Sequence, residues 1–521
     1  MHRLINMTED GFILVFDVGS TKLKAGLVSI KDFRVYFKAS DKSEIYYPKR
    51  GWAEQDPEKL WSQIISLSRK MMEESGVKKK DVLALIYTAH MAGVLPIAED
   101  GTPLENIITW LDERAAGLPE ELWKGLLRIE EYNLFKLIRF LRITGGAPSK
   151  TGKDPLSKII WLREYEPDIY NSVYKFLDAK GYLIYKSTGN IVTSPDEANL
   201  TWLADTRNGK AVWSRPILNM FKLDEKSFPE IKDSIDIAGK LKKDVADELG
   251  VEADIPVFVG AGDIPTTAIG SGVVEEGKPH IYIGTSDWIA AHLSKRKTDI
   301  FHYIGSLLSA IPGKYLLIAE QEIAGGALEW AMNILGIKEG DYKSVEEAVE
   351  SSEPGSNRIL FLPWLYGERA PIDDPFLRGG LINFSLDHGK SDILRSIMEG
   401  VAFNIKWAYK YFQKMIPPQN IINIIGGGTL FDQWCQIVSD VLEIEIRRLK
   451  EPQYAGLRGG ATIASVGLGI YKDFKEAVSR YAIDKVFTPD NNLSKIYNIH
   501  FQEFTNFYKK NKDIYKKLNT Y

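Results

Sequence analysis

Short runs of consecutive apolar residues, each followed by a polar or glycine-rich turn, mark the candidate strands of this chain. The clearest runs are residues 12–16, 82–87, 256–259, 281–283 and 421–425. Runs of this length that are rich in β-branched and aromatic residues are typical of strands buried on both faces. A second strand is expected over residues 23–30 and another over 94–98.

Between these runs, apolar residues recur every three or four positions, which predicts amphipathic helices. One helix is expected to begin at Pro57 with Asp56 as its N-cap, because Asp accepts amide hydrogen bonds and Pro suits the first helical position. Other helices are expected over residues 240–248, 392–411 and 456–469, near residue 432, and after residue 493. Strands that alternate with helices in this way indicate an α/β fold.

Two similar turns lie in different halves of the chain. Asp17-Val18-Gly19-Ser20-Thr21 follows the first apolar run, and Gly284-Thr285-Ser286 follows residues 281–283. The chain has 521 residues, and single cores stop growing near roughly 250–300 residues. We therefore predict two related domains, residues 1–257 and 258–521. No long Pro/Gly/Ser-rich linker separates them, so we expect them to pack together around a cleft.

Composition and charge narrow the class of protein. Hydrophobic residues make up 44% and charged residues 26%, as in an ordinary globular protein. The net charge of -4, from 66 basic and 70 acidic residues, argues against a nucleic-acid-binding protein. The only cysteine, Cys435, lies in an apolar helical pattern and is expected to be buried, so a disulfide within the chain and a cysteine zinc cluster are both excluded. With neither a signal peptide nor an apolar run of the roughly 20 residues that a membrane span needs, we expect a cytoplasmic protein without membrane contact.

The glycine-rich turns are candidate phosphate sites. Backbone amides and Ser or Thr hydroxyls can bind phosphate without lysine. Asp17 would repel phosphate, and its expected task is to hold hydrated Mg²⁺. Gly426-Gly427-Gly428, before a helix, could admit a phosphate or a flat base. Each turn taken alone is equally an ordinary hairpin or strand–helix connection, and the Walker pattern of P-loop kinases is missing.

Asp263 is the candidate catalytic carboxylate. It ends the sequence Gly260-Ala261-Gly262-Asp263, which follows a buried strand, and functional groups gather at the carboxyl ends of such strands. The alternative is a purely local role, in which Asp263 caps the helix that begins near Pro265.

In their order along the chain, these motifs resemble the FGGY family of carbohydrate kinases. The resemblance extends from about residue 12 to residue 469. Further segments similar to the family are Gly51-Trp52-Ala53-Glu54-Gln55-Asp56-Pro57, Tyr366-Gly367-Glu368-Arg369-Ala370-Pro371 with Asp374-Pro375 and Arg378-Gly379, and Gly426-Gly427-Gly428 with Trp434, Gln436 and Asp440. The resemblance implies an α/β fold of two actin-like, ribonuclease-H-like domains that flank a catalytic cleft.

The segments expected to bind the sugar resemble the xylulokinase branch of the family. These segments are His90-Met91-Ala92-Gly93 and Trp110-Leu111-Asp112-Glu113-Arg114. The chain departs from the branch at four places, which are Ala92 in place of a histidine, Leu111 in place of a polar residue, Asp287-Trp288 after the second turn, and Thr429-Leu430-Phe431 in the adenosine motif.

The resemblance implies an ATP- and Mg²⁺-dependent kinase that phosphorylates a small sugar or polyol, with a ketopentose such as D-xylulose as the first choice. Asp263 would be the catalytic base and Asp17 the residue near the metal. The residues implied to bind sugar are Trp52, His90, Met91, Trp110 and Asp112. Those implied to bind ATP and its phosphates are Gly19, Ser20, Thr21, Gly284, Thr285, Ser286, Gly426, Gly427 and Gly428.

Two other functions stay open at this point, an actin-like ATPase and a catalytically silent sugar sensor. Homodimers are common in the family, although no residue pattern of this chain demands one.

Overall fold

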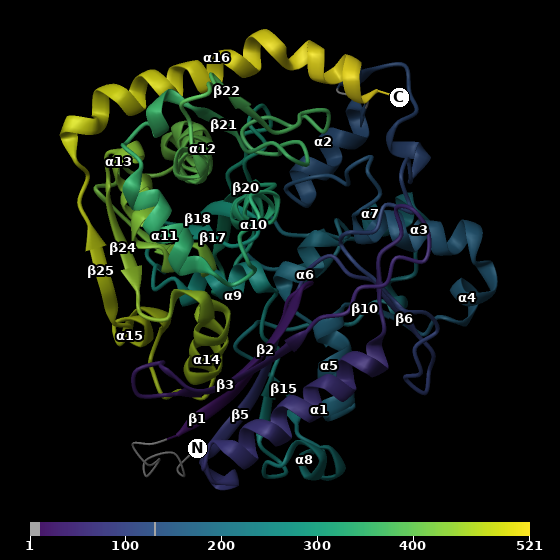
Figure 1. Ribbon diagram of the computed structural model, residues 1–521. Coiled ribbons are helices and arrows are strands. Elements are labelled where there is room, and N and C mark those ends of the chain that lie inside the picture. Colours follow the sequence, from purple (N-terminus) through teal and green to yellow (C-terminus); the bar gives the residue numbers. More distant parts are fainter. Residues whose placement is uncertain (1–10, 130–131, 521) are drawn as a thin grey trace.

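Two sheets organise the chain, and Figure 1 shows them in separate domains of a computed structural model that describes residues 11–129 and 132–520. In order across the first sheet, the strands are β15 (Ile237–Lys240), β16 (Pro256–Phe258), β5 (Val82–Ala89), β1 (Phe12–Val18), β2 (Lys22–Ser29) and β3 (Val35–Lys42). In order across the second, they are β19 (Gly305–Leu308), β20 (Tyr315–Gln321), β18 (Asp287–Leu293), β17 (Pro279–Ile283), β23 (Ile421–Ile425), β24 (Glu445–Leu449) and β25 (Ile483–Phe487).

The two sheets share one central topology. In the first, β1, β2 and β3 are antiparallel neighbours, while β5 and β16 continue in parallel on the other side of β1. In the second, β17, β18 and β20 are the antiparallel neighbours, and β23 and β24 are the parallel ones. The predicted α/β fold with two related halves is confirmed. The predicted boundary at residue 257 falls inside β16, a strand of the first sheet, and the position of the boundary stays a prediction.

Most of the predicted helices are present within a few residues of their expected bounds. Asp56 is the N-cap of α1 (Pro57–Glu74), and its Oδ1 accepts hydrogen bonds from the backbone N–H of Glu58 at 2.9 Å and of Lys59 at 3.0 Å. The other helices mentioned below or expected from the sequence are α5 (Ala179–Thr188), α6 (Pro195–Leu200), α8 (Lys243–Leu249), α9 (Asp263–Gly270), α10 (Gly325–Ile334), α12 (Lys390–Phe412), α13 (Asp432–Leu442), α14 (Ala455–Gly467) and α16 (Ser494–Asn519). Figure 1 shows α16 along the outer side of the second domain, and α1 and α8 on the outside of the first.

The candidate turns of each sheet lie together at the carboxyl ends of its parallel strands. Because β1, β5 and β16 are parallel, the turns that follow them lie at the same edge of the first sheet, with Asp17 opposite Thr88. In the second sheet, Tyr282 of β17 lies opposite Ile425 of β23, so the turns after these two strands are neighbours as well. Open α/β sheets bind their ligands beyond the carboxyl ends of the parallel strands, which is where these turns lie.

Helix α14 joins the two domains by close packing. It contacts β1, β2 and β5 of the first sheet and lies directly against α9. Glycines make this approach possible, since a Cβ on Gly459 would lie 1.9 Å from the carbonyl oxygen of Thr266, and one on Gly270 would lie 1.8 Å from that of Ala455. The Gly/Ala-rich pattern of residues 456–469 therefore marks a helix held against a neighbouring backbone.

We expect Gly459→Ala to destabilise the protein by about 1–3 kcal/mol or more, because the added methyl meets backbone atoms that cannot rotate away. Gly305→Ala is the matched control, since a Cβ there meets no atom within 4 Å. Chemical denaturation of both variants measures the effect. Equal free energies of unfolding for Gly459→Ala and wild type would show that α9 and α14 can move apart to accommodate the methyl group without loss of stability.

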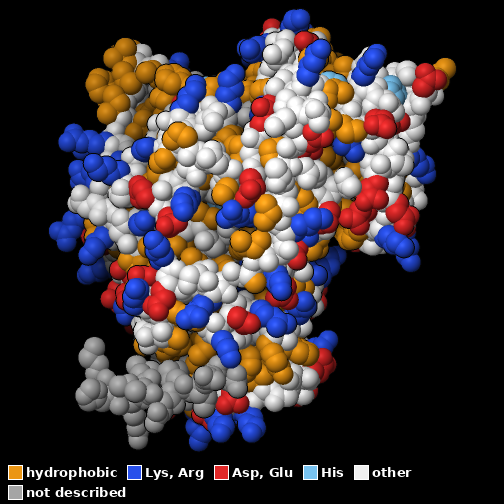
Figure 2. Space-filling view, turned by 90° about the vertical axis from the view of Figure 1, so that its left-hand side faces the viewer, with side chains coloured by type: hydrophobic (Ala, Val, Ile, Leu, Met, Phe, Trp, Pro, Cys, Tyr) orange, Lys and Arg blue, Asp and Glu red, His pale blue; other side chains and the backbone are white. Residues whose placement is uncertain are grey.

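No helix of the described part of the chain is both long and apolar enough to cross a membrane. Figure 2 shows Lys and Arg side chains interspersed with Asp and Glu over one whole face of the molecule. The concentrated basic surface of a nucleic-acid-binding protein is not seen on that face.

Candidate functional site

Asp17 is held at the end of β1 by a tight turn and an ion pair. The backbone N–H of Gly19 donates to the carbonyl of Lys22 at 3.1 Å, which closes the turn. Lys24 Nζ lies 3.2 Å from Asp17 Oδ2, and the charge of Asp17 raises the pKa of Lys24 above its usual range. The N-terminus of α14 approaches from the other side, because a Cβ on Gly456 would lie 2.7 Å from Asp17 Oδ2. Asp17 is therefore positioned by its own hairpin and is also approached by α14, which is distant in the sequence.

Asp263 is the first residue of α9, and Gly262 is the N-cap. Its Oδ1 accepts a hydrogen bond from the backbone N–H of Ile264 at 2.9 Å, while the side chain stays partly exposed. Burial, and after it the negative charge of Asp17, raises the pKa of Asp263 to about 7. A carboxyl group with a pKa near neutrality is suited to take up a proton during a reaction.

Met91 packs directly against this loop. A Cβ on Gly262 would lie 2.3 Å from Met91 Cγ, so glycine is required at position 262 for this contact. The predicted sugar-binding segment therefore touches the loop that carries Asp263.

His90 follows β5 and is buried with one ring nitrogen paired. Its Nε2 lies 3.0 Å from Gln55 Oε1. Because Gln55 Nε2 donates to Ser43 Oγ at 3.0 Å, Gln55 Oε1 is the acceptor and His90 Nε2 carries the proton. Burial lowers the pKa of His90 to about 4, so the ring is neutral at physiological pH. His90 Nδ1 is then an acceptor, and no partner for it occurs within the residues that the structure describes.

Asp112 takes part in a buried ion-pair network beneath Trp52. Its Oδ2 accepts from the backbone N–H of Ala53 at 2.6 Å, and both of its oxygens accept from the Arg114 guanidinium at 2.8–3.0 Å. Arg114 also donates to Glu54 Oε1 at 2.6 Å and stacks on the Trp52 ring, with Cζ 3.7 Å from the ring centroid. The acceptor capacity of Asp112 is largely occupied in this arrangement, which suits a residue that positions Trp52.

Trp110 connects the segment expected to bind sugar with the first phosphate turn. Its Nε1 donates to Ser20 Oγ at 2.8 Å, and the ring is partly exposed. The two motifs are 90 positions apart in the sequence and are in direct contact in the fold.

The glycine turns of the second domain lie side by side. The N-terminus of α10 docks on the first of them, where Gly325 N–H donates to the carbonyl of Gly284 at 2.7 Å. Gly426 has a φ of +102°, and a Cβ there would lie 2.3 Å from the carbonyl oxygen of Ile283. Thr285 and Gly427 are exposed, and a Cβ on Gly427 would meet open space. These two turns form an accessible surface at the edge of the second sheet.

Tyr282, which precedes the Gly284 turn, links the two sides of the site. Burial raises its pKa, and the charges of Lys24, Asp17 and Asp263 all act on it. The second sheet therefore approaches the Asp17–Asp263 pair at the carboxyl ends of the first sheet's parallel strands.

Two residues of this site, Asp196 and Lys24, belong to none of the sequence motifs. Asp196 of α6 is fully buried, and its Oδ2 accepts from the Gly262 N–H at 2.7 Å, immediately before Asp263. Lys24, the partner of Asp17, is a partly buried lysine two positions after the exposed Lys22 of the same strand, and the strand pattern did not distinguish the two. Asp196 offered no signal, because only the tertiary structure brings residues 196 and 262 together.

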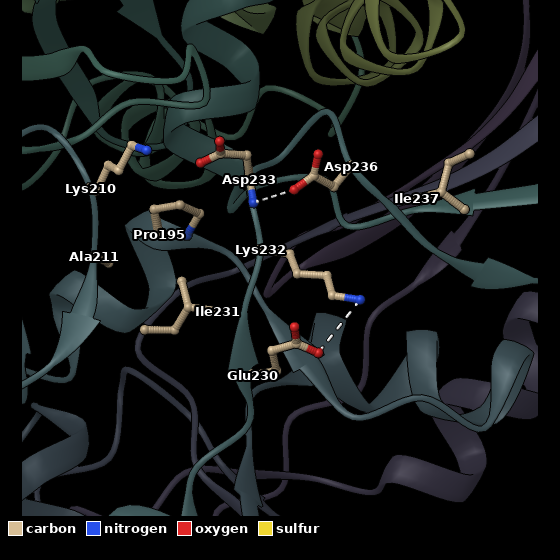
Figure 3. A pocket seen from close by; sticks show the side chains of 9 residues that line it. All are labelled: Pro195, Lys210, Ala211, Glu230, Ile231, Lys232, Asp233, Asp236 and Ile237. Carbon is tan, nitrogen blue, oxygen red and sulfur yellow. Dashed lines mark hydrogen bonds and ion pairs between the residues drawn. The ribbon is translucent and has the colours of Figure 1, made fainter.

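A pocket of about 550 Å³ lies between the start of α6 and residues 230–237 (Figure 3). Its wall includes Asp233, whose N–H donates to Asp236 Oδ2 at 3.0 Å, and the ion pair between Lys232 and Glu230 at 3.5 Å. The residues that line it are Pro195, Lys210, Ala211, Glu230, Ile231, Lys232, Asp233, Asp236 and Ile237. None of the predicted site residues lines this pocket.

The two sheets and their common topology define a protein of the two-domain actin-like class. Models of the N-terminal and C-terminal domains of the FGGY family of carbohydrate kinases match residues 12–270 and 280–468. The chain belongs to this family.

Relatives cover almost the whole chain. It is 26% identical to a xylulose kinase of Staphylococcus epidermidis, with 98% of each chain covered. It is 28% identical to a xylulose kinase of Staphylococcus xylosus, with 96% of this chain and 99% of the relative covered. Among solved structures, a gluconate kinase from Lactobacillus acidophilus has the same fold, with a TM-score of 0.86 and 24% identity over 98% of this chain and 100% of that one. Family membership makes the protein a carbohydrate kinase, with a sugar as acceptor and ATP as co-substrate.

Proposed function

We propose that this kinase transfers the γ-phosphate of ATP to a primary hydroxyl of a small sugar or polyol, with a ketopentose such as D-xylulose as the acceptor. The observation that carries the proposal is the approach of Asp17 and Asp263 to each other, with Tyr282, which precedes the Gly284–Ser286 turn, close enough to be affected by both charges. The names of the Staphylococcus relatives support the choice of xylulose, and that of the Lactobacillus structure makes gluconate the second candidate. We propose residues 1–257 as the domain that mainly binds the sugar and residues 258–521 as the one that mainly binds ATP. The cytoplasmic location stays a prediction of the sequence.

Asp263 is proposed as the general base. Its partly exposed carboxylate would accept the proton of the acceptor hydroxyl as that oxygen attacks the γ-phosphorus in line with the leaving oxygen. A positioned base contributes typically about 10²–10⁴-fold to such a step. Positioning and electrostatic stabilisation supply the rest of the rate.

The residues around Asp17 fit a magnesium ion that retains most of its water. Asp17 and Asp263 are close enough for one charge to raise the pKa of the other, and two such carboxylates favour a divalent cation between or beside them. Within the described residues, no group of three or more His, Cys, Asp or Glu could hold a metal ion. This agrees with Mg²⁺ bound through one or two carboxylates, water and the phosphates of the nucleotide. When bound, the ion would neutralise charge on the phosphate oxygens.

The remaining motif residues divide between the two substrates. Gly19, Ser20, Thr21, Gly284, Thr285 and Ser286 are proposed around the transferring phosphate, and Gly426, Gly427 and Gly428 around the rest of the nucleotide. His90 offers a buried acceptor to a sugar hydroxyl through Nδ1. Met91, Trp52 and Trp110 supply apolar walls. Asp112 was predicted to contact the sugar, and the five hydrogen bonds that its carboxylate accepts favour an indirect part, in which it positions Trp52 and Arg114.

ADP release with Mg²⁺-ATP across a panel of ketopentoses, aldoses, polyols and sugar acids tests the proposal. A single strong response to D-xylulose supports it, while a single response to D-gluconate would move the assignment to the sugar acid. Sugar-independent ATP hydrolysis alone would favour an actin-like ATPase. Tight sugar binding without turnover would favour a silent sensor.

The pH dependence of kcat/KM follows from the raised pKa of Asp263. The carboxyl group must be ionised to accept a proton, so we expect kcat/KM for the sugar to be constant above about pH 8 and to fall on the acid side of about pH 7. Rates between pH 5 and 9 with both Mg²⁺-ATP and the sugar well below saturation measure this limb, because they report the pKa of the free enzyme, before a cation lies beside Asp263. An acid limb near pH 4, the usual range of an aspartate, would contradict the described environment of Asp263.

A further inference from the structure

Asp287 is buried without a hydrogen-bond partner directly after the Gly284–Ser286 turn. It is the first residue of β18 and is only 1% exposed. Neither carboxylate oxygen has a hydrogen-bond partner within the part of the chain that the structure describes. Buried polar groups are nearly always paired, and an unpaired carboxylate requires an explanation such as a bound ion.

Gln321 places a further unpaired oxygen on the same face of the sheet. It lies directly opposite Asp287 in the β18–β20 register and is fully buried. Its Nε2 donates to the carbonyl oxygens of Ala370 at 3.1 Å and Asn404 at 3.0 Å. These two acceptors fix the orientation of the amide, so the unpaired atom is Oε1. The pair from β18 and β20 therefore presents three buried oxygen acceptors and no donor.

Glu368 adds a second buried carboxylate to this region. Its side chain is only 2% exposed. Burial and, after it, the negative charge of Glu368 raise the pKa of Asp287 well above its usual range. Glu368 Oε1 accepts from the backbone N–H of Glu322 at 3.1 Å and of Arg369 at 2.9 Å. The Arg369 guanidinium is paired with Glu320 and Glu322, so it is not directed at Asp287.

We propose that Asp287 and Gln321, with Glu368 beside them, bind a monovalent alkali cation, K⁺ or Na⁺. Carboxylate and amide oxygens are ligands for hard cations. One positive charge would offset the cost of two buried carboxylates, which is large while they lack a counter-charge. Glu368 Oε2 accepts from Asn404 Nδ2 at 2.5 Å, so Asp287 supplies the carboxylate oxygens that are free to bind the ion, and their single charge is matched by a monovalent cation.

The position of the site indicates that the cation would stabilise the Gly284–Ser286 turn of the second domain. Asp287 follows Ser286 in the chain and pairs with Ile283, which precedes the Gly284 turn. A cation at Asp287 would therefore hold both ends of the turn proposed to contact the phosphate. This effect on catalysis rests on the proposed function, whereas cation binding itself does not.

Thermal unfolding in KCl, NaCl and choline chloride at equal ionic strength tests binding without any assay of activity. We expect a saturable rise of Tm in K⁺ or Na⁺ over choline. Asp287→Asn should raise the half-saturating cation concentration by at least about tenfold, as expected for loss of a ligand. Asp233→Asn, a change of a partly buried carboxylate in the pocket beside α6, should leave the response intact. Gln321→Met keeps the charges and should also weaken the cation response. It provides the test if Asp287→Asn does not fold.

Crystals soaked in Rb⁺ would show an anomalous peak between Asp287 and Gln321 if the inference is right. Identical Tm values in all three salts, together with an Asp287→Asn variant that is at least as stable as wild type in each, would overturn it and show a protonated, ion-free Asp287. A normal cation response with no sugar kinase activity would leave this site standing and would count against the proposed function alone.

Discussion

Asp263→Asn should reduce the turnover of sugar phosphorylation by at least about 10²-fold while the protein folds normally. The amide has the same shape as the carboxylate and retains an oxygen for the backbone N–H of Ile264. It cannot accept the proton of the sugar hydroxyl. Because the substitution also removes a charge that is disfavoured by burial and by Asp17, the variant should be at least as stable as wild type at pH 8. Steady-state ADP release and thermal unfolding measure the two effects.

Asp233→Asn is a suitable control for this variant, because Asp233 is another partly buried carboxylate and lines a pocket that contains none of the predicted site residues. It should retain wild-type turnover. Calorimetry of sugar binding and of Mg²⁺-ATP binding to Asp263→Asn should show both ligands bound within a few-fold of the wild-type affinity. Turnover within a few-fold of wild type would remove Asp263 from the role of base and would favour the local capping role for its side chain.

Arg114→Leu should have the largest effect on stability, a loss of about 3–5 kcal/mol in the free energy of unfolding. The Arg114 side chain is 2% exposed, and its substitution leaves the buried carboxylates of Asp112 and Glu54 without a counter-charge. It also removes the cation stacked on Trp52. Urea unfolding of the variant and of wild type at pH 7 measures the change.

Arg207→Leu provides the matched control, because Arg207 forms an ion pair with Asp205 on the surface, where its side chain is 48% exposed. Its effect should stay within about 0.5 kcal/mol. The double variant Arg114→Leu/Asp112→Asn should lose less than the sum of the two single variants, since the residues act as one network. Additive losses would show that Arg114 stabilises the protein by packing alone.

Local physical chemistry made much of the fold predictable. Asp56 and Pro57 specify a helix start because the cap and the fixed φ act over three residues, and that helix begins where expected. The apolar runs around residues 14, 85 and 282 specify strands because each is bounded by residues that break regular pairing. The similarity of the two polar turns indicated two related halves, which the common topology of the two sheets confirms.

The candidate site could be predicted only as a set of separate turns. Which of them face each other depends on parallel strand register and on the contact between α14 and α9, both of which join residues far apart in the chain. The occupied hydrogen bonds of Asp112, the neutral ring of His90 and the contact of Asp196 with Gly262 likewise arise from such pairings.

The order of elements, the two related halves and the chemical type of each turn could be predicted, because these features depend on neighbouring residues. The raised pKa of Asp263, the pairing of Arg114 and the lack of a hydrogen-bond partner for Asp287 among the described residues arise only in the folded chain. Burial and the distance between charges set these properties, and both are produced by packing of segments that the sequence leaves far apart.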